Sequence, residues 1–215
     1  MAGDDELDAL LAEQVAYYRA VAGEYGDYGA MPGVSALGEV IEEFAPAGRV
    51  LELACGPGVW TPLLARHADE VTAVDASPEM LARAAARVDE RVRWVEADVF
   101  GWRPDGVFDV VFFGFWLSHV PRERFAEFWA MVAGCLAPGG RVLFVDDALR
   151  TAEELVEGVE STTIRRWAGD GGVHRAVKVA YRPDELSREL AGLGWSVEVR
   201  LTEWPFYWGA GRPGA

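Results

Sequence analysis

Lysine, cysteine and long hydrophobic runs are all scarce in this sequence. The two cysteines, Cys55 and Cys135, have neither metal-ligand spacing nor a disulfide framework, so we expect no metal site. No apolar run is long enough to span a bilayer. The segment Met1–Asp8 is acidic and lacks the basic and apolar regions of a signal peptide. These absences predict a cytoplasmic protein without a membrane partner.

Positive charge is also scarce, because 35 acidic residues face 20 basic ones and give a formal net charge of −15. Nucleic acids bind basic surfaces, so this balance predicts no nucleic-acid partner. A small anion held by a local basic pocket remains compatible with it. Lys178 is the only lysine, and the general preference for arginine is explained by GC-rich coding.

Strands and helices alternate through the middle of the chain, whose 215 residues fit one domain. We expect strands at Arg49–Ala54, Glu70–Asp75, Val92–Ala97, Val107–Phe113 and Arg141–Asp146. Helices are expected up to Ala65, over Pro78–Val88 and over Arg122–Leu136. Such alternation predicts right-handed βαβ units and a parallel sheet.

Both ends of the chain depart from this alternation. Residues 1–45 carry two expected helices, Asp5–Ala22 and Val34–Phe44, joined by the glycine-rich segment Gly23–Gly33. We assign residues 46–147 to a core, 148–182 to an insertion and 183–215 to a closing unit. The insertion is expected to hold a helix near Ala152–Val159 and a hairpin of Thr162–Trp167 and Val173–Tyr181. The closing unit is expected to hold a helix, Asp184–Leu193, and strands at Val197–Thr202 and Phe206–Gly209.

The first chemical motif is the CGPG sequence after the strand at Arg49–Ala54. Glycine lets a ligand approach the backbone, and the carboxyl end of a parallel strand is where ligands bind in such sheets. No Gly-Lys-Ser/Thr follows, so the motif is not a phosphate-binding P-loop. The loop alone is a weak signal.

Acidic residues follow the next two expected strands. Asp75 ends one strand, where a carboxylate can accept hydrogen bonds from both ribose hydroxyls of an adenosine. Asp98 follows the other, within reach of an adenine amino group. Three ligand-binding features at successive strand ends favour a nucleoside site over ordinary solvated loops.

From about Val50 to Asp147 the chain resembles the class I S-adenosylmethionine-dependent methyltransferases, in VLELACGPG, VTAVDASPEML, VEADVF, FDVVFFGFWLSHVP and LAPGGRVLFVDD. The resemblance implies a Rossmann-like α/β fold with a mostly parallel seven-stranded sheet, helices on both faces, an N-terminal helical lid and an inserted β-hairpin. It also implies S-adenosylmethionine as the cofactor. The implied cofactor-binding residues are Glu52, Ala54, Gly56, Gly58, Asp75, Ala76, Met80, Asp98, Val99 and Phe115. Ala54 stands where the family often has glycine.

The N-terminal segment with Tyr17, Tyr18, Arg19, Glu24 and Tyr25 also resembles that family, in which it looks like a lid over the cofactor. Tyr18 and Arg19 are therefore cofactor candidates, and Arg19 could pair with the cofactor's carboxylate. An ordinary amphipathic helix with a solvated arginine is the alternative.

His119, in Ser-His-Val-Pro beyond the fourth expected strand, is a candidate base or hydrogen-bond donor at the transferred methyl group. The alternative is a histidine that caps the following helix. We also count Tyr28, Arg166 and Lys178 among the catalytic candidates. Arg166 and Lys178 belong to the hairpin, which concentrates basic residues in an acidic chain and could cradle an anion or simply face solvent: Arg165, Arg166, His174, Arg175, Lys178 and Arg182.

Four further motifs, FGFWLSHVP, RRWAGDGG, VKVAY and FYWGAGR, resemble the small actinobacterial methyltransferases that include the phosphonate O-methyltransferase of the dehydrophos antibiotic pathway. This resemblance implies a small anionic substrate, a phosphonate above all, in antibiotic biosynthesis. Two alternatives remain open: O- or N-methylation of a neutral or aromatic metabolite, and a cofactor-binding protein without catalysis. The sequence does not specify the oligomeric state.

Overall fold

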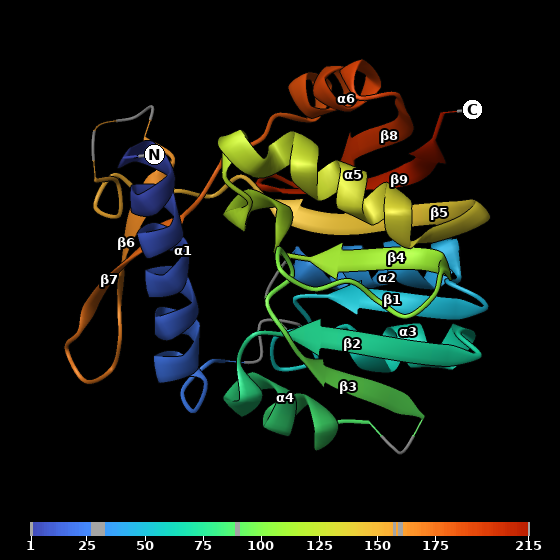
Figure 1. Cartoon of the computed structure of the whole chain (residues 1–215), viewed down its shortest axis with the longest axis horizontal. Coiled ribbons are helices and arrows are strands. Elements are labelled where there is room, and N and C mark those ends of the chain that lie inside the picture. Colours follow the sequence, from blue (N-terminus) through green and yellow to red (C-terminus); the bar gives the residue numbers. More distant parts are fainter. Residues whose placement is uncertain (1, 27–32, 89–90, 157, 159–160, 215) are drawn as a thin grey trace.

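The computed structural model describes residues 2–26, 33–88, 91–156, 158 and 161–214. Its main element is a seven-stranded sheet in the order β3-β2-β1-β4-β5-β9-β8 (Figure 1). The strands are β1 (Arg49–Leu53), β2 (Glu70–Asp75), β3 (Val92–Glu96), β4 (Phe108–Gly114), β5 (Leu136–Asp147), β8 (Trp195–Leu201) and β9 (Phe206–Pro213). Strands β1 to β5 pair in parallel, and β9 pairs antiparallel with both β5 and β8. The expected Rossmann-like α/β architecture is confirmed.

Helices cover both faces of this sheet. They are α1 (Ala2–Val21), α2 (Val34–Phe44), α3 (Thr61–His67), α4 (Pro78–Ala85), α5 (Phe125–Cys135) and α6 (Pro183–Gly192), with short 3₁₀ turns η2 (Leu117–His119) and η3 (Arg122–Arg124). Helices α5 and α6 lie on one face of the sheet, and α2 and α3 lie on the other (Figure 1). None of the helices in the described part of the chain is both long and apolar enough to cross a membrane.

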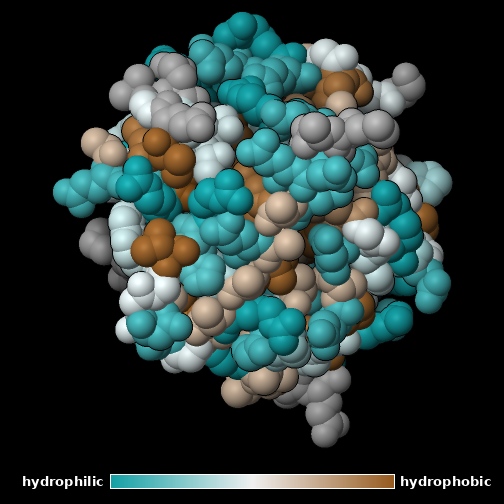
Figure 2. All heavy atoms as spheres, turned by 60° about the vertical axis from the view of Figure 1, so that its left-hand side comes forward, coloured by the Kyte–Doolittle hydropathy of each residue, from teal (hydrophilic) through white to brown (hydrophobic). Residues whose placement is uncertain are grey.

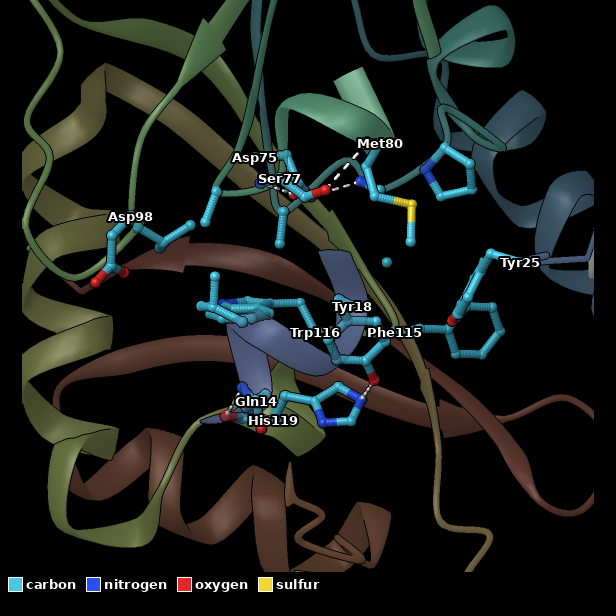
Figure 3. A pocket seen from close by; sticks show the side chains of 17 residues that line it. Gln14, Tyr18, Tyr25, Asp75, Ser77, Met80, Asp98, Phe115, Trp116 and His119 are labelled. Atoms are coloured by element: carbon cyan, nitrogen blue, oxygen red, sulfur yellow. Dashed lines mark hydrogen bonds between the residues drawn. The ribbon is translucent and has the colours of Figure 1, made fainter. Parts of the chain in front are cut away.

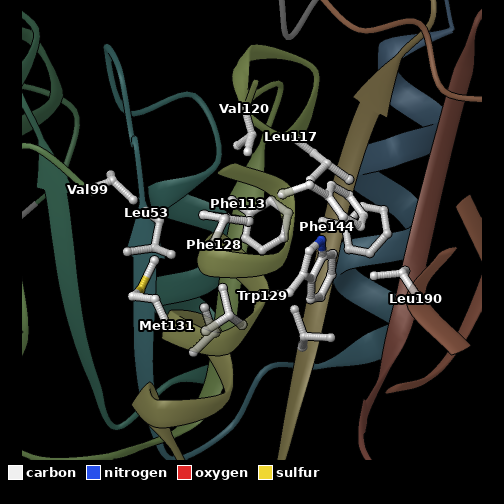
Figure 4. Close-up of a cluster of buried hydrophobic side chains, with 14 of the residues drawn as sticks. Leu53, Val99, Phe113, Leu117, Val120, Phe128, Trp129, Met131, Phe144 and Leu190 are labelled. Atoms are coloured by element: carbon white, nitrogen blue, oxygen red, sulfur yellow. The ribbon is translucent and has the colours of Figure 1, made fainter. Parts of the chain in front are cut away.

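Two hydrophobic cores result, because successive residues of a strand point to opposite faces. Phe112 packs with α2 and α3, whereas its neighbour Phe113 packs with α5. Figure 4 shows the second core, where Trp129 of α5 lies among aromatic rings. The Trp129 ring contacts the rings of Phe113, Phe144 and Trp195 at centroid distances of 5.8, 5.7 and 4.8 Å. This core fixes the strand ends that carry the site.

The N-terminal helix and the inserted hairpin lie together at the carboxyl edge of the sheet. In Figure 1 the arrowheads of β1, β2 and β4 point toward α1, beside which lie β6 (Thr163–Trp167) and β7 (Val173–Val177). The hairpin is a separate two-stranded sheet, and the backbone N–H of Arg175 donates to the Glu13 carboxylate of α1 at 2.7 Å. From this side the surface is mostly hydrophilic with separate apolar spots (Figure 2). Helix and hairpin thus form one cap, which we call the α1–hairpin cap.

The prediction of a helix near Ala152–Val159 is wrong for the described residues of that range. Thr151 and Glu154 instead form a turn, in which the Thr151 N–H donates to the Glu154 carboxylate at 3.0 Å, and Leu155 forms an isolated bridge with Ile164. The hairpin supplies backbone partners to this segment, and those partners replace helical hydrogen bonds. Val159 lies outside the described residues.

Strand boundaries also differ from expectation. Strand β5 starts at Leu136 rather than Arg141. The Pro-Gly-Gly segment lies within the strand, where the register of the pairing with β4 shifts. Strand β9 reaches Pro213, and β7 ends at Val177 instead of Tyr181.

We expect Trp129→Ala to lower the free energy of unfolding by about 3–5 kcal/mol, because it leaves a cavity among fully buried rings. Trp167→Ala is the control, since the Trp167 residue is 52% exposed and should change stability by about 0.5 kcal/mol or less. Urea unfolding of both variants measures the difference. Equal losses would contradict the packing described for Trp129.

Candidate active site

A pocket lies at the carboxyl ends of β1, β2, β3 and β4, below α1 (Figure 3). It encloses about 720 Å³ of empty space, part of it open to solvent. The lining residues are Gln14, Val15, Tyr18, Tyr25, Ala54, Gly56, Pro57, Asp75, Ala76, Ser77, Met80, Asp98, Val99, Gly114, Phe115, Trp116 and His119. All of the expected cofactor-binding residues belong to this set except Arg19, Glu52 and Gly58.

The loop after β1 forms one wall through its backbone. Gly56 has a φ of 53°, and no atom of the described residues lies within 4 Å of the position a Cβ would take there. Ala54 has a φ of 50°, a left-handed conformation that costs an alanine about 1–2 kcal/mol and that glycine adopts without this cost. Gly58 does not line the pocket: a Cβ on it would lie 2.7 Å from the Ala84 Cβ, so this glycine allows the loop to pack on α4.

Asp75 holds that loop from the end of β2. Its two carboxylate oxygens accept the backbone N–H groups of Gly56 and Ser77, each at 2.8 Å. Burial raises the pKa of Asp75, while these hydrogen bonds lower it. Each oxygen has a second lone pair, so the carboxylate can still accept hydrogen bonds from the hydroxyls of a ribose.

Further lining residues give the pocket an apolar part and a second acid. Met80 and Val99 are buried and apolar, and Ala76 lies between Asp75 and Ser77 in the lining. Asp98 lies at the far end of the pocket from Tyr25 in Figure 3, and its Oδ1 accepts the Phe100 N–H at 3.0 Å. Apolar residues and two acids, Asp75 and Asp98, are the groups expected to hold an adenosine, and the ribose and adenine roles of the two acids stay predictions.

Phe115 lines the pocket in a left-handed conformation, with a φ of 55°. Its backbone N–H donates to the Val145 carbonyl at 2.8 Å, and its ring lies 5.9 Å from the Trp60 ring. Such a conformation is strained for a bulky residue, and strain of this kind is concentrated at functional sites. The implied role of Phe115 in binding the cofactor stays a prediction.

Glu52 lies behind the pocket rather than in its wall. The Thr61 hydroxyl donates to its Oε2 at 2.7 Å, and its Oε1 has no hydrogen-bond partner among the described residues. Burial raises the pKa of Glu52 to about 8. Glu52 is therefore protonated at neutral pH and does not offer the cofactor a carboxylate in this arrangement.

His119 is buried at the end of η2 and has a defined tautomer. Its Nδ1 lies 2.6 Å from the Val177 carbonyl, which can only accept, so Nδ1 carries the proton. Burial, followed by the charges of Lys178 and Arg166, holds the pKa of His119 well below its usual range and keeps the ring neutral. Nε2 is then an acceptor, and the Tyr18 hydroxyl donates to it at 2.9 Å (Figure 3).

Arg19 points elsewhere. Its guanidinium forms two hydrogen bonds with the Glu79 carboxylate, at 3.2 and 3.1 Å, and it does not line the pocket. Arg83 of α4 donates to the carbonyls of Ala22, Gly23 and Tyr25, and so anchors the segment after α1. Tyr28 lies outside the described residues.

Lys178 is buried in a network of acids. Its ammonium donates to Asp147 Oδ2 and Ser118 Oγ, each at 3.0 Å, and lies 3.8 Å from Asp146. Asp146 in turn accepts the Ser118 backbone N–H at 2.8 Å, and burial raises the pKa of Asp146 to about 6. The ammonium thus holds the turn that presents His119 and does not itself line the pocket.

The expected basic cluster is divided by the hairpin register. Arg166 pairs across the strands with His174, and Arg165 with Arg175, so the two pairs face opposite sides. Arg166 forms an ion pair with Glu154, Arg175 with Glu13, and the exposed Arg182 with Asp184 and Glu185. The positive charge of Arg166 nevertheless lowers the pKa values of Tyr18, Tyr25 and His119. For the two tyrosines it opposes the larger effect of burial, and for His119 it adds to that effect.

Gln14 and Trp116 line the pocket although the sequence assigned them no site role, and Tyr25 lines it as part of the segment expected to cover the cofactor. Gln14 is one helical turn before Tyr18, so helical spacing is the signal that could have identified it. Trp116 directly follows Phe115, in a segment already singled out.

Comparisons with known proteins agree with this geometry. Residues 50–140 match the family model described as a methyltransferase domain. The DhpI-SAM-HEP complex is similar in structure, with a TM-score of 0.84 and 39% identity over 95% of this chain and 98% of that chain. A DhpI-SAH complex gives a TM-score of 0.82 and 40% identity over 95% of this chain and 97% of that chain.

A trans-aconitate 2-methyltransferase from Streptomyces avermitilis is 34% identical over 127 residues, which are 56% of this chain and 46% of that protein. An uncharacterized methyltransferase of Mycobacterium tuberculosis is 34% identical over 118 residues, 52% of this chain and 59% of that protein. The chain thus spans about half the length of these curated relatives. The chain belongs to the S-adenosylmethionine-dependent methyltransferases, and S-adenosylmethionine is its cofactor.

Asp75→Ala should weaken binding of S-adenosylhomocysteine by about 1.5–3 kcal/mol, because hydrogen bonds to a charged acceptor are lost. Calorimetric titration measures the affinity, and thermal unfolding checks that the fold remains. Asp69→Ala, at an exposed position outside the pocket, is the control. An unchanged affinity of Asp75→Ala would refute the ribose-binding role.

Glu52 makes stability depend on pH. The pKa of Glu52 is about 8 in the folded protein, whereas its ordinary value is 4.5. The contribution of Glu52 to stability is therefore fully present below pH 4.5 and is lost as pH rises through about 8. Glu52→Gln should therefore become more stable relative to the parent as pH rises across that window. Urea unfolding of the ligand-free protein at several pH values tests this, and a constant difference would contradict a protonated Glu52.

Proposed function

We propose that this protein transfers a methyl group from S-adenosylmethionine to an oxygen of a small anionic metabolite, with a phosphonate in antibiotic biosynthesis as the acceptor. The similarity to DhpI, the dehydrophos methyltransferase, supports a phosphonate as the acceptor, since it extends over 95% of the chain. The DhpI complex contains a further molecule, HEP, besides SAM. The similarity to a trans-aconitate methyltransferase, whose named substrate is a carboxylate, is compatible with an anionic acceptor.

The observation that carries this proposal is the pair of cationic side chains beside His119. Lys178 and Arg166 act electrostatically on the His119 ring, although the chain as a whole is acidic. An anion in the adjoining part of the pocket would be attracted by both charges, and this attraction is stronger in a closed cleft than in water. Arginine can donate two parallel hydrogen bonds to one anion, whereas lysine acts as a point charge.

Both cations already have acidic partners, and this sets a condition on anion binding. Glu154 pairs with Arg166, and Asp147 with Lys178. The acceptor anion must therefore share these cations or replace the carboxylates. A partly neutralised cation holds an anion less tightly, which leaves an acceptor oxygen free to react.

The cofactor supplies an electrophilic methyl group on a sulfonium. A phosphonate oxygen is already anionic at neutral pH, so the protein's contribution is to orient it, exclude water and neutralise charge. The aromatic residues Tyr18, Tyr25, Phe115 and Trp116 wall the pocket and exclude water. Since the Nε2 lone pair of His119 is directed at the Tyr18 hydroxyl, His119 orients Tyr18 rather than acting as a free base.

The aromatic wall also favours a second candidate, a neutral or aromatic acceptor. A neutral hydroxyl must lose a proton, so its methylation would depend on His119 more than on either cation. The alternative of another class, a cofactor-binding protein without catalysis, disagrees with the methyltransferase family of the chain and would convert no cofactor with any acceptor.

The test is steady-state kinetics of Arg166→Ala, Lys178→Met and His119→Ala with a small phosphonate and a phenol side by side. With the phosphonate, both cation variants should lose at least about 10-fold in kcat/KM, the effect of one hydrogen bond to a charged group. His119→Ala should slow turnover less. Cofactor affinity should change little in the cation variants.

Arg165→Ala is the matched control for Arg166→Ala, because Arg165 is the next residue of the same strand and faces the opposite side. Parent-like turnover of the phosphonate by both cation variants would rule out a role of Arg166 and Lys178 in holding the acceptor and would favour the neutral acceptor. Formation of S-adenosylhomocysteine with neither acceptor in the parent would count against methyl transfer to both classes of acceptor.

A further inference from the structure

Gln14 carries the only side-chain amide of the protein, because the sequence has one glutamine and no asparagine. The residue is 2% exposed and lines the pocket. A carboxamide has a donor on one atom and an acceptor on the other, and buried polar groups of this kind are expected to use both.

The amide of Gln14 joins two distant parts of the backbone. Its Oε1 accepts the Val177 N–H at 2.8 Å, and its Nε2 donates to the His119 carbonyl at 3.5 Å. Gln14 and Tyr18 are four residues apart on α1, and both approach His119 from that helix in Figure 3. One face of α1 therefore contacts the backbone and the ring of His119.

Val177 closes these contacts into a ring of hydrogen bonds. Its N–H donates to Gln14, and its carbonyl accepts Nδ1–H of His119 at 2.6 Å. Gln14 thus fixes the residue that sets the tautomer of His119, and it also holds the backbone of His119 itself. Displacing α1 would break the Gln14 and Tyr18 contacts together.

We propose that Gln14 is a positioning residue, which couples the docking of α1 over the pocket to the orientation and tautomer of His119. This inference rests on the proposed function, in which methyl transfer takes place in this pocket. His119 then presents Nε2 to Tyr18 only when α1 covers the pocket.

The chemistry of the carboxamide makes this role specific. Leucine has a similar length but neither donor nor acceptor. Glutamate keeps an acceptor for the Val177 N–H but, when ionised, cannot donate to the His119 carbonyl. Gln14→Leu therefore removes both hydrogen bonds, and Gln14→Glu removes one.

Glu13 provides the matched control. It lies on the same helix and accepts the backbone N–H and the Nε–H of Arg175 at 2.7 and 2.9 Å, so it also docks α1 on β7. Glu13 does not line the pocket. Glu13→Leu removes these two hydrogen bonds but leaves the contacts of Gln14 and Tyr18, so α1 should stay docked at His119.

The experiment uses the full chain saturated with S-adenosylhomocysteine and labelled with ¹⁵N in its histidine rings. Ring ¹H–¹⁵N correlations give the tautomer of His119, with His67 and His174 as internal references. We expect a single Nδ1–H tautomer in the parent and in Glu13→Leu. In Gln14→Leu we expect a second tautomer, and kcat lower by about 10-fold with little change in KM for the cofactor.

A single Nδ1–H tautomer in Gln14→Leu, or the same tautomer change in Glu13→Leu, would overturn the proposal. If Gln14→Leu does not fold, Gln14→Glu takes its place and should show a smaller change of the same kind. The spectra need no methyl acceptor, so they support or overturn the role of Gln14 even where the parent fails to methylate a phosphonate.

Discussion

The hydrogen bond from the His119 ring to the Val177 carbonyl connects the turn that lines the pocket with the inserted hairpin. His119 belongs to the turn after β4, Val177 ends the inserted hairpin, and Tyr18 of α1 completes the contact on the other ring nitrogen. Because the carbonyl can only accept, this one bond sets the tautomer and leaves the second nitrogen for Tyr18. Helix α1 therefore contacts His119 through a neutral pair of side chains, where a charged pair would have lost more hydration.

Buried charge is balanced locally in the same region. Asp146 lies at the end of β5 and accepts two hydrogen bonds from Ser118, the residue before His119. Lys178 lies over this carboxylate and that of Asp147, so the only lysine of an acidic chain is used where a buried acid and a partly buried acid lie side by side. A buried ammonium with several acceptors is held in one place, and it fixes the turn that carries the histidine.

Local sequence signals predicted much of the core and of the cofactor site. The strand at Glu70–Asp75 has the predicted bounds, and Ser77 caps α4 as its position before Pro78 indicates, through a 3.1 Å bond from the Met80 N–H. Strand ends in a parallel sheet meet at one edge, which is why Asp75 and Asp98 could be expected to line one pocket. The helix near Ala152–Val159 could not be excluded locally, because its replacement by a turn and a bridge depends on the hairpin that pairs with it.

The sequence by itself determined the order of strands and helices, the glycine loop and the acids at the strand ends, since each depends on neighbours a few residues away. Only the tertiary structure decided the partners of the charged and polar residues brought together from far apart. It paired Arg19 with Glu79, Lys178 with Asp147 and Gln14 with Val177. Such pairs depend on which side chains meet when α1 and the hairpin close over the sheet, and no periodicity along the chain encodes those distances.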